Sequence, residues 1–143
     1  MSASGASGRQ AMIDLLRSTR TIAVVGCSDR PERDSYRVAA YLQAAGYRVV
    51  PVNPACTEVL GERCYPDLSA VPAEIEIDLV DVFRRPEAVP EVVEQVVARG
   101  VPALWLQLGV GHPEAEARAR RAGVTVVSDR CLEVDHAALV GAL

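Results

Sequence analysis

Residues that can bind an anion follow the apolar segment 22–25 of this sequence. Gly26, Ser28, Arg30 and Arg33 lie between that β-branched segment and a helical pattern that begins near residue 34. In a turn from a strand to a helix, backbone N–H groups converge on one place, and the helix dipole favours negative charge there. Arginine side chains add bidentate hydrogen bonds to phosphate. The loop therefore predicts a cradle for a phosphate-bearing ligand.

The same loop departs from the glycine-rich motif of dinucleotide-binding proteins. Of the G-x-G-x-x-G pattern only Gly26 is present, and Cys27 and Ser28 follow it. NAD binding also uses an acidic residue at the end of the second strand, where this chain has Asn53. A P-loop is excluded, because all fifteen basic residues are arginine. NADP stays open as an alternative, because the arginines of the loop could accept its 2′-phosphate.

Further arginines follow other predicted strands. Arg84, Arg85 and Arg130 each lie within two residues of the end of a predicted strand. An isolated surface arginine is most often a solvated charge. Because the carboxyl ends of parallel strands meet at one edge of a sheet, we expect these side chains to gather near Arg30 and Arg33.

The apolar segments predict an α/β protein. Helices are expected at residues 11–17, 34–45, 86–99, 112–122 and 134–143, and strands at 21–26, 47–52, 77–83, 103–108 and 124–128. Near-continuous apolar strands that alternate with helices indicate a doubly wound, Rossmann-like parallel sheet of five strands with helices on both faces. Residues 55–73, with a hinge-like Gly61, are expected to connect the second and third strands. Trp105 is expected in the core.

Such a sheet places its ligand in a crevice at the carboxyl ends of the strands. Five segments should line it: residues 26–33, 52–54, 83–85, 107–109 and 129–131. Tyr36 and Phe83 could flank an adenine there, or simply pack.

Size and charge limit the classes of function. The chain has 143 residues and a net charge of −4. This length fits one domain over residues 10–143, after a disordered tail of residues 1–9. The acidic balance argues against nucleic-acid and membrane partners. No signal peptide and no apolar segment of membrane-spanning length is evident, so a cytoplasmic protein is expected.

The sequence offers no cluster suited to catalysis or metal binding. None of the four cysteines forms a C-x-x-C pair, and neither His112 nor His136 belongs to a recognisable triad. His112 is expected to cap a helix. Cys27 and Cys131 are expected to face the crevice as small apolar residues, although a thiol near a helix N-terminus can have a lowered pKa. We therefore expect no metal and no catalytic residue.

Five segments taken together resemble a known family. Residues 24–28, 50–54, 80–84, 104–109 and 129–131 read VVGCS, VPVNP, VDVFR, LWLQLG and DRC. In this order and spacing they resemble the stand-alone CoA-binding domains, which are similar to the N-terminal CoA-binding domain of the succinyl-CoA synthetase α subunit. The resemblance covers residues 10–140 and implies a Rossmann fold that binds coenzyme A.

The resemblance also implies a set of binding residues. Carried over by position, they are Gly26, Cys27, Ser28, Arg30, Arg33, Val52, Asn53, Pro54, Phe83, Arg84, Gln107, Leu108, Gly109, Arg130 and Cys131. The first loop would surround the phosphates, and residues 52–54 would line the adenosine or ribose. Residues 83–84 would lie beside the diphosphate or adenine, residues 107–109 toward the pantetheine arm, and residues 130–131 would close that end.

One part of the succinyl-CoA synthetases has no counterpart in this sequence. Those enzymes carry a phosphorylated histidine in a second domain, and neither His112 nor His136 lies in that motif context. The resemblance therefore implies a protein that binds CoA or an acyl-CoA and performs no chemistry of its own. An NADP-dependent oxidoreductase, a homodimer and a regulatory subunit of a ligase-like partner stay open as alternatives.

Overall fold

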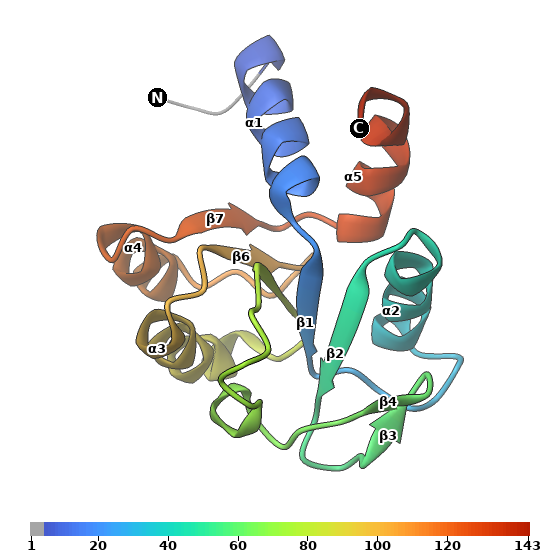
Figure 1. Cartoon of the computed structure of the whole chain (residues 1–143). Helices are drawn as coiled ribbons and strands as arrows, with labels where there is room; N and C mark the ends of the chain where they lie inside the picture. The colour runs from blue at the N-terminus through green and yellow to red at the C-terminus, as the bar shows by residue number, and fades with distance from the viewer. Residues whose placement is uncertain (1–4) are drawn as a thin grey trace.

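The computed structural model describes residues 5–143 and has a central parallel sheet with helices on both faces (Figure 1). The sheet has five strands in the order β2-β1-β5-β6-β7. They are β1 (Thr21–Val25), β2 (Arg48–Val52), β5 (Leu79–Val82), β6 (Ala103–Leu106) and β7 (Thr125–Ser128). The predicted Rossmann-like α/β fold is thus confirmed. The chain leaves β1 toward β2 and leaves β5 toward β6, so the direction of winding reverses between β1 and β5.

Five helices connect and cover the strands. They are α1 (Gly5–Ser18), α2 (Asp34–Ala44), α3 (Val89–Arg99), α4 (Pro113–Arg121) and α5 (Leu132–Leu139). No helix of residues 5–143 has both the length and the apolar character needed to cross a membrane. The helix α1 begins at Gly5, before the predicted start at residue 11. Of the predicted N-terminal tail, residues 1–4 lie outside the described part of the chain.

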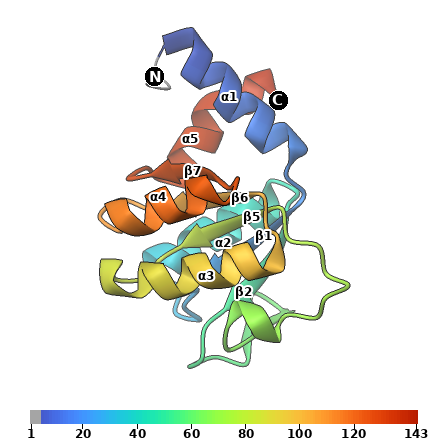
Figure 2. The same ribbon diagram turned by 90° about the vertical axis from the view of Figure 1, so that its left-hand side faces the viewer.

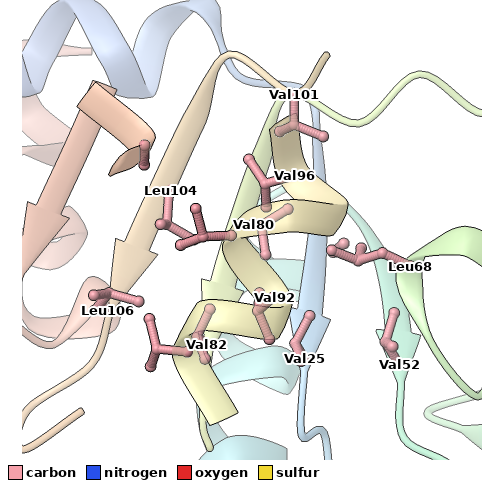
Figure 3. Packing of buried hydrophobic residues seen from close by; sticks show 14 of the residues in the cluster. Val25, Val52, Leu68, Val80, Val82, Val92, Val96, Val101, Leu104 and Leu106 are labelled. Atoms are coloured by element: carbon pink, nitrogen blue, oxygen red, sulfur yellow. The ribbon is translucent and has the colours of Figure 1, made fainter. Parts of the chain in front are cut away.

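One layer of helices packs on each face of the sheet (Figure 2). On one face, Val80, Val82 and Leu104 of the sheet face Val92 and Val96 of α3 (Figure 3). The opposite face packs against α1, α2 and α5 and includes Val24, Leu79 and Trp105, which is fully buried as predicted, together with Leu42 and Leu132. Because both faces are covered, the strands are apolar almost throughout.

The predicted connecting segment 55–73 contains structure that the sequence pattern did not indicate. It holds a two-stranded antiparallel hairpin of β3 (Glu58–Val59) and β4 (Glu62–Arg63). Leu60 and Gly61 form its turn with φ angles of 54° and 77°, a pairing of positive φ values that suits a tight hairpin. Gly61 is therefore a turn residue rather than a hinge. A 3₁₀ turn (Leu68–Ala70) follows the hairpin.

Two helix starts also differ from the prediction. A 3₁₀ turn (Pro86–Ala88) precedes α3, which begins at Val89 rather than at residue 86. The last helix begins at Leu132 rather than at residue 134, and a 3₁₀ turn (Val140–Ala142) follows it. The guanidinium of Arg17, near the end of α1, donates a 2.7 Å hydrogen bond to the carbonyl of Ala142. This contact joins the two terminal segments near the amino ends of the parallel strands.

Candidate ligand crevice at the carboxyl edge

Gly26 joins the ends of three strands at the carboxyl edge. Its N–H donates a 2.8 Å hydrogen bond to the carbonyl of Val52, while the N–H of Phe83 donates one of 2.8 Å to the carbonyl of Val25. Gly26 has φ of +85°, and a Cβ at this position would overlap the carbonyl oxygen of Phe83 and lie 3.2 Å from Cδ of Arg84. Only glycine fits here, because both the backbone conformation and the close approach exclude a side chain.

The loop after Gly26 is closed by its own hydrogen bonds. Ser28 donates its N–H to Oγ of Ser35 at 2.9 Å, and Oγ of Ser28 accepts the N–H of Arg30 at 3.0 Å. The N–H of Arg33 donates to the carbonyl of Arg30 at 3.0 Å. This compact turn leads into α2, whose N-terminus has no side-chain cap. The first N–H groups of α2 are therefore open to an anion.

The second strand end is held by Asn53. Its side-chain amide donates a 3.0 Å hydrogen bond to the carbonyl of Cys27, and its side-chain oxygen accepts the N–H of Ala55 at 2.9 Å. Asn53 thus ties the first loop to the segment after β2. Val52 is buried and Pro54 is exposed beside it.

A cavity of about 470 Å³ opens over the ends of β5 and β6. Six of the predicted site residues line it: Phe83, Arg84, Gln107, Leu108, Gly109 and Cys131. Arg85 lies there too, as predicted from its place after a strand. The helix α2 completes the wall with Asp34, Arg37 and Val38, which sequence reasoning missed. The available signal was the spacing of Arg37, four residues after Arg33, which is the N-cap residue of α2.

The other predicted residues lie outside the lining of this cavity. They are Gly26, Cys27, Ser28, Arg30, Arg33, Val52, Asn53, Pro54 and Arg130. Most of them follow the ends of β1, which neighbours β5 in the sheet, and of β2, which lies on the other side of β1. The carboxyl edge therefore has two parts: a cavity over β5 and β6, and the closed loop beside it over β1 and β2.

The arginines at this edge differ in what they contact. Arg130 forms two hydrogen bonds with the carboxylate of Asp135, at 2.6 and 2.9 Å, which raise the pKa of its guanidinium. Arg37 contacts Asp34 at 2.8 Å and Glu133 at 3.2 Å, and both hydrogen bonds raise its pKa. Both cations are thus already neutralised by carboxylates.

Four other arginines keep their charge available. Within the described residues, no carboxylate forms a salt bridge with any of Arg30, Arg33, Arg84 and Arg85. All four are exposed. A multiply charged anion at this edge would meet guanidinium groups from both of its parts.

The two cysteines predicted at the crevice differ in exposure. Cys27 is fully buried, and this burial is the main cause that raises the pKa of its thiol to about 12. Its thiol is therefore protonated and packs as a small apolar group, and the alternative of a lowered pKa does not hold. Cys131 is half-buried and lines the cavity at the start of α5.

The two histidines serve the structure. Nδ1 of His112 accepts the N–H of Ala115 at 3.2 Å and so caps α4, as predicted. His136 is buried, and its Nδ1 pairs with the hydroxyl of Tyr41 at 2.8 Å. Across residues 5–143 there is no group of three or more His, Cys, Asp or Glu side chains arranged to hold a metal ion.

The fold and this edge define a class of protein: a small doubly wound α/β domain with exposed arginines at the carboxyl ends of its strands, near the switch point of the sheet. A sequence model of the CoA binding domain matches residues 20–137. The chain belongs to this family of CoA-binding domains.

Two individual proteins are similar to this chain over most of their length. The chain is 40% identical over 124 residues to the uncharacterized protein YneT of Bacillus subtilis (strain 168), covering 87% of this chain and 90% of that protein. A hypothetical protein from Pyrococcus horikoshii OT3 has a similar structure, with a TM-score of 0.89 and 38% identity over 93% of this chain and 92% of that one.

A longer relative is an enzyme. The acetate–CoA ligase [ADP-forming] of Methanocaldococcus jannaschii is 26% identical over 135 residues, which is 89% of this chain and 19% of the ligase. This chain therefore corresponds to about a fifth of that protein.

Proposed function

We propose that this protein binds coenzyme A or an acyl-CoA in the crevice at the carboxyl edge of its sheet. The observation that carries the proposal is the set of four unpaired, exposed arginines at this edge, in a chain of the CoA-binding domain family. CoA carries a 3′-phosphate and a diphosphate, which require more positive charge than NAD does. Guanidinium groups bind such phosphates with charge-assisted, bidentate hydrogen bonds.

The proposed placement of the ligand follows the two parts of the edge. Arg30, Arg33 and the open N-terminus of α2 hold phosphate, with Gly26, Cys27 and Ser28 shaping the loop beneath it. The adenosine lies against residues 52–54 and 83–84. The pantetheine arm follows the cavity past Gln107, Leu108 and Gly109 toward residues 130–131.

We further propose that the chain binds its ligand without catalysing a reaction. The ligase relative is about five times longer than the matched segment, since that segment is 19% of its length. The other parts of that ligase lie outside its match to this chain. Two binding partners are further candidates: a protein that supplies those parts, and a second copy of this chain. Size-exclusion chromatography of the native complex from lysate tests both.

The four free cysteines of residues 27, 56, 64 and 131 suit a reducing compartment. We accordingly place the protein in the cytoplasm. Cell fractionation followed by immunodetection tests this placement, and recovery with secreted or membrane fractions would reject it.

Isothermal titration calorimetry with CoA, acetyl-CoA, 3′-dephospho-CoA, NADPH and ATP tests the proposed ligand. Saturable binding of CoA, weakened for the dephospho form and absent for NADPH, is the expected result. NADPH binding without CoA binding would instead favour the oxidoreductase alternative. Failure of CoA to bind at millimolar concentration would reject the proposal.

A further inference from the structure

Asp81 is a buried carboxyl group without a partner. It lies at the third position of β5 and is 0% exposed. Neither of its oxygens has a hydrogen-bond partner within the described residues. A buried polar group that lacks a hydrogen-bond partner lowers the free energy of unfolding. Such a group in a central strand therefore requires an explanation.

The position of Asp81 relates it directly to the crevice. Along β5 it pairs with Val24 of β1 on one side and with Trp105 of β6 on the other. Side chains two residues apart on a strand point to the same face. Asp81 therefore lies on the same face as Phe83, one step deeper, and Phe83 lines the cavity.

The neighbouring strand repeats this arrangement. Gln107 lines the cavity, and Trp105, two residues earlier, lies beside Asp81. Gln107 is held in place because its side-chain oxygen accepts the N–H of Leu132 at 3.2 Å. Phe83, which is half-buried, directly follows the end of β5 and is the next residue on this face between Asp81 and the carboxyl end of the strand.

Burial raises the pKa of Asp81 well above its usual range, so the group is a neutral carboxylic acid. A neutral carboxylic acid offers one O–H donor and a carbonyl acceptor side by side. An amide, with its N–H and C=O, complements that pair. The phosphates of a nucleotide do not, because they are anions that accept hydrogen bonds only.

We propose that Asp81 is the deep end of the crevice, where it hydrogen-bonds an amide of the ligand's arm once the ring of Phe83 turns aside. This inference rests on the proposed function, because the pantetheine arm of CoA contains amide groups. The bound ligand then satisfies a carboxyl group that the protein alone leaves without a partner. Asp81 hydrogen-bonds the pantetheine arm, while the arginines bind the phosphates.

Calorimetric titration with two probes separates the arm from the nucleotide. CoA contains both, and adenosine 3′,5′-bisphosphate contains the nucleotide alone. For Asp81→Val we expect CoA affinity to fall about tenfold, the effect of one well-made hydrogen bond. Affinity for the bisphosphate should stay within about twofold, because its contacts lie at the arginines.

Two further variants complete the comparison. Asp81→Asn keeps a donor and an acceptor, so CoA affinity should stay within about threefold. Asp78→Asn is the matched control directly before the amino end of β5, where the Asp78 carboxylate accepts the N–H groups of Arg20 and Thr21 at 2.9 and 3.0 Å. It should change neither affinity. The melting temperature of ligand-free Asp81→Val should rise, because an unpartnered polar group is removed.

The outcomes distinguish the two proposals. If the wild-type protein binds neither probe, the proposed function fails. If it binds CoA, and Asp81→Val binds CoA equally well or loses both probes equally, only the role of Asp81 is overturned. A second measurement needs no variant: the ¹³C resonance of the Asp81 carboxyl should move on addition of CoA and not of the bisphosphate. An unmoved resonance with CoA would overturn the inference even if Asp81→Val failed to fold.

Discussion

The backbone of Gly26 lies against the carbonyl group of Phe83, so that a Cβ at Gly26 would be 3.0 Å from the Phe83 carbonyl carbon and would overlap its oxygen. This contact positions the first loop relative to the strand that carries Phe83 and Arg84. The glycine therefore serves the packing of two strand ends at least as much as the approach of a ligand.

Gly26→Ala should destabilise the protein by about 3 kcal/mol, the sum of a left-handed backbone and an overpacked contact. Gly123→Ala is the matched control, because its φ of +89° is similar and a Cβ there would meet nothing within 4 Å. It should cost only about 1 kcal/mol. Urea unfolding of both variants measures the difference. Equal losses would show that the contact with Phe83 is unimportant.

Replacing an unpaired arginine of the first loop should weaken CoA binding. Arg30→Ala and Arg33→Ala should each cost more than ~1 kcal/mol of binding free energy, the upper range of an exposed ion pair, because charge-assisted bonds to phosphate are stronger. Arg48→Ala is the control, since Arg48 is exposed at the amino end of β2. Calorimetry at two salt concentrations measures both. Unchanged affinity in both loop variants would refute the proposed position of the phosphates.

Arg130→Ala is expected to behave differently. Its guanidinium is already held by Asp135, so its loss should change CoA affinity less than the loss of Arg30 or Arg33. Its backbone carbonyl, which accepts the indole N–H of Trp105 at 2.8 Å, remains in the variant. The dissociation constants of the three variants for CoA check this order. If Arg130→Ala lost the most affinity, the proposed order of the three arginines would be wrong.

Arg99 should hold the segment before β5 in place. Its guanidinium donates to four carbonyls: those of Leu68, Val71, Pro72 and Ile75, at 3.1, 2.8, 2.7 and 3.0 Å. Arg99→Lys cannot reproduce this planar set of donors and should cost about 2 kcal/mol of stability. Hydrogen exchange should accelerate in residues 68–77 and not in β6. Unaltered exchange there would contradict the role.

His136 should make stability depend on pH. Burial lowers the pKa of its imidazole below the usual 6.5, so the unfolded chain takes up a proton at a higher pH than the folded one does. The free energy of unfolding should therefore fall as the pH is lowered through 6.5 toward the folded pKa. His136→Gln removes this contribution, so the stability of the variant relative to the wild type should rise as the pH is lowered from 7 to 5. Parallel curves for the two proteins would contradict the prediction.

The sequence predicted the five strands of the sheet because each is long enough to show an apolar segment bounded by glycine or proline. It missed the hairpin of β3 and β4, since strands of two residues carry no periodicity. It predicted that residues after β5, β6 and β7 would meet. It could not show that Asp135 holds the guanidinium of Arg130, because the turn between them decides that contact. Nor could it show that Asp81 lacks a partner, which depends on every neighbouring side chain.

The hydrogen bond between Arg17 and Ala142 has a practical consequence. The bond lies where the strands begin, and α1 and the C-terminus are at the opposite end of the molecule from the carboxyl ends of β1 and β2 (Figure 1). A surface tether attached at the C-terminal residue would therefore present the crevice to bulk solution. The kinetics of ligand capture could then be followed on an immobilised sample without the support blocking the site.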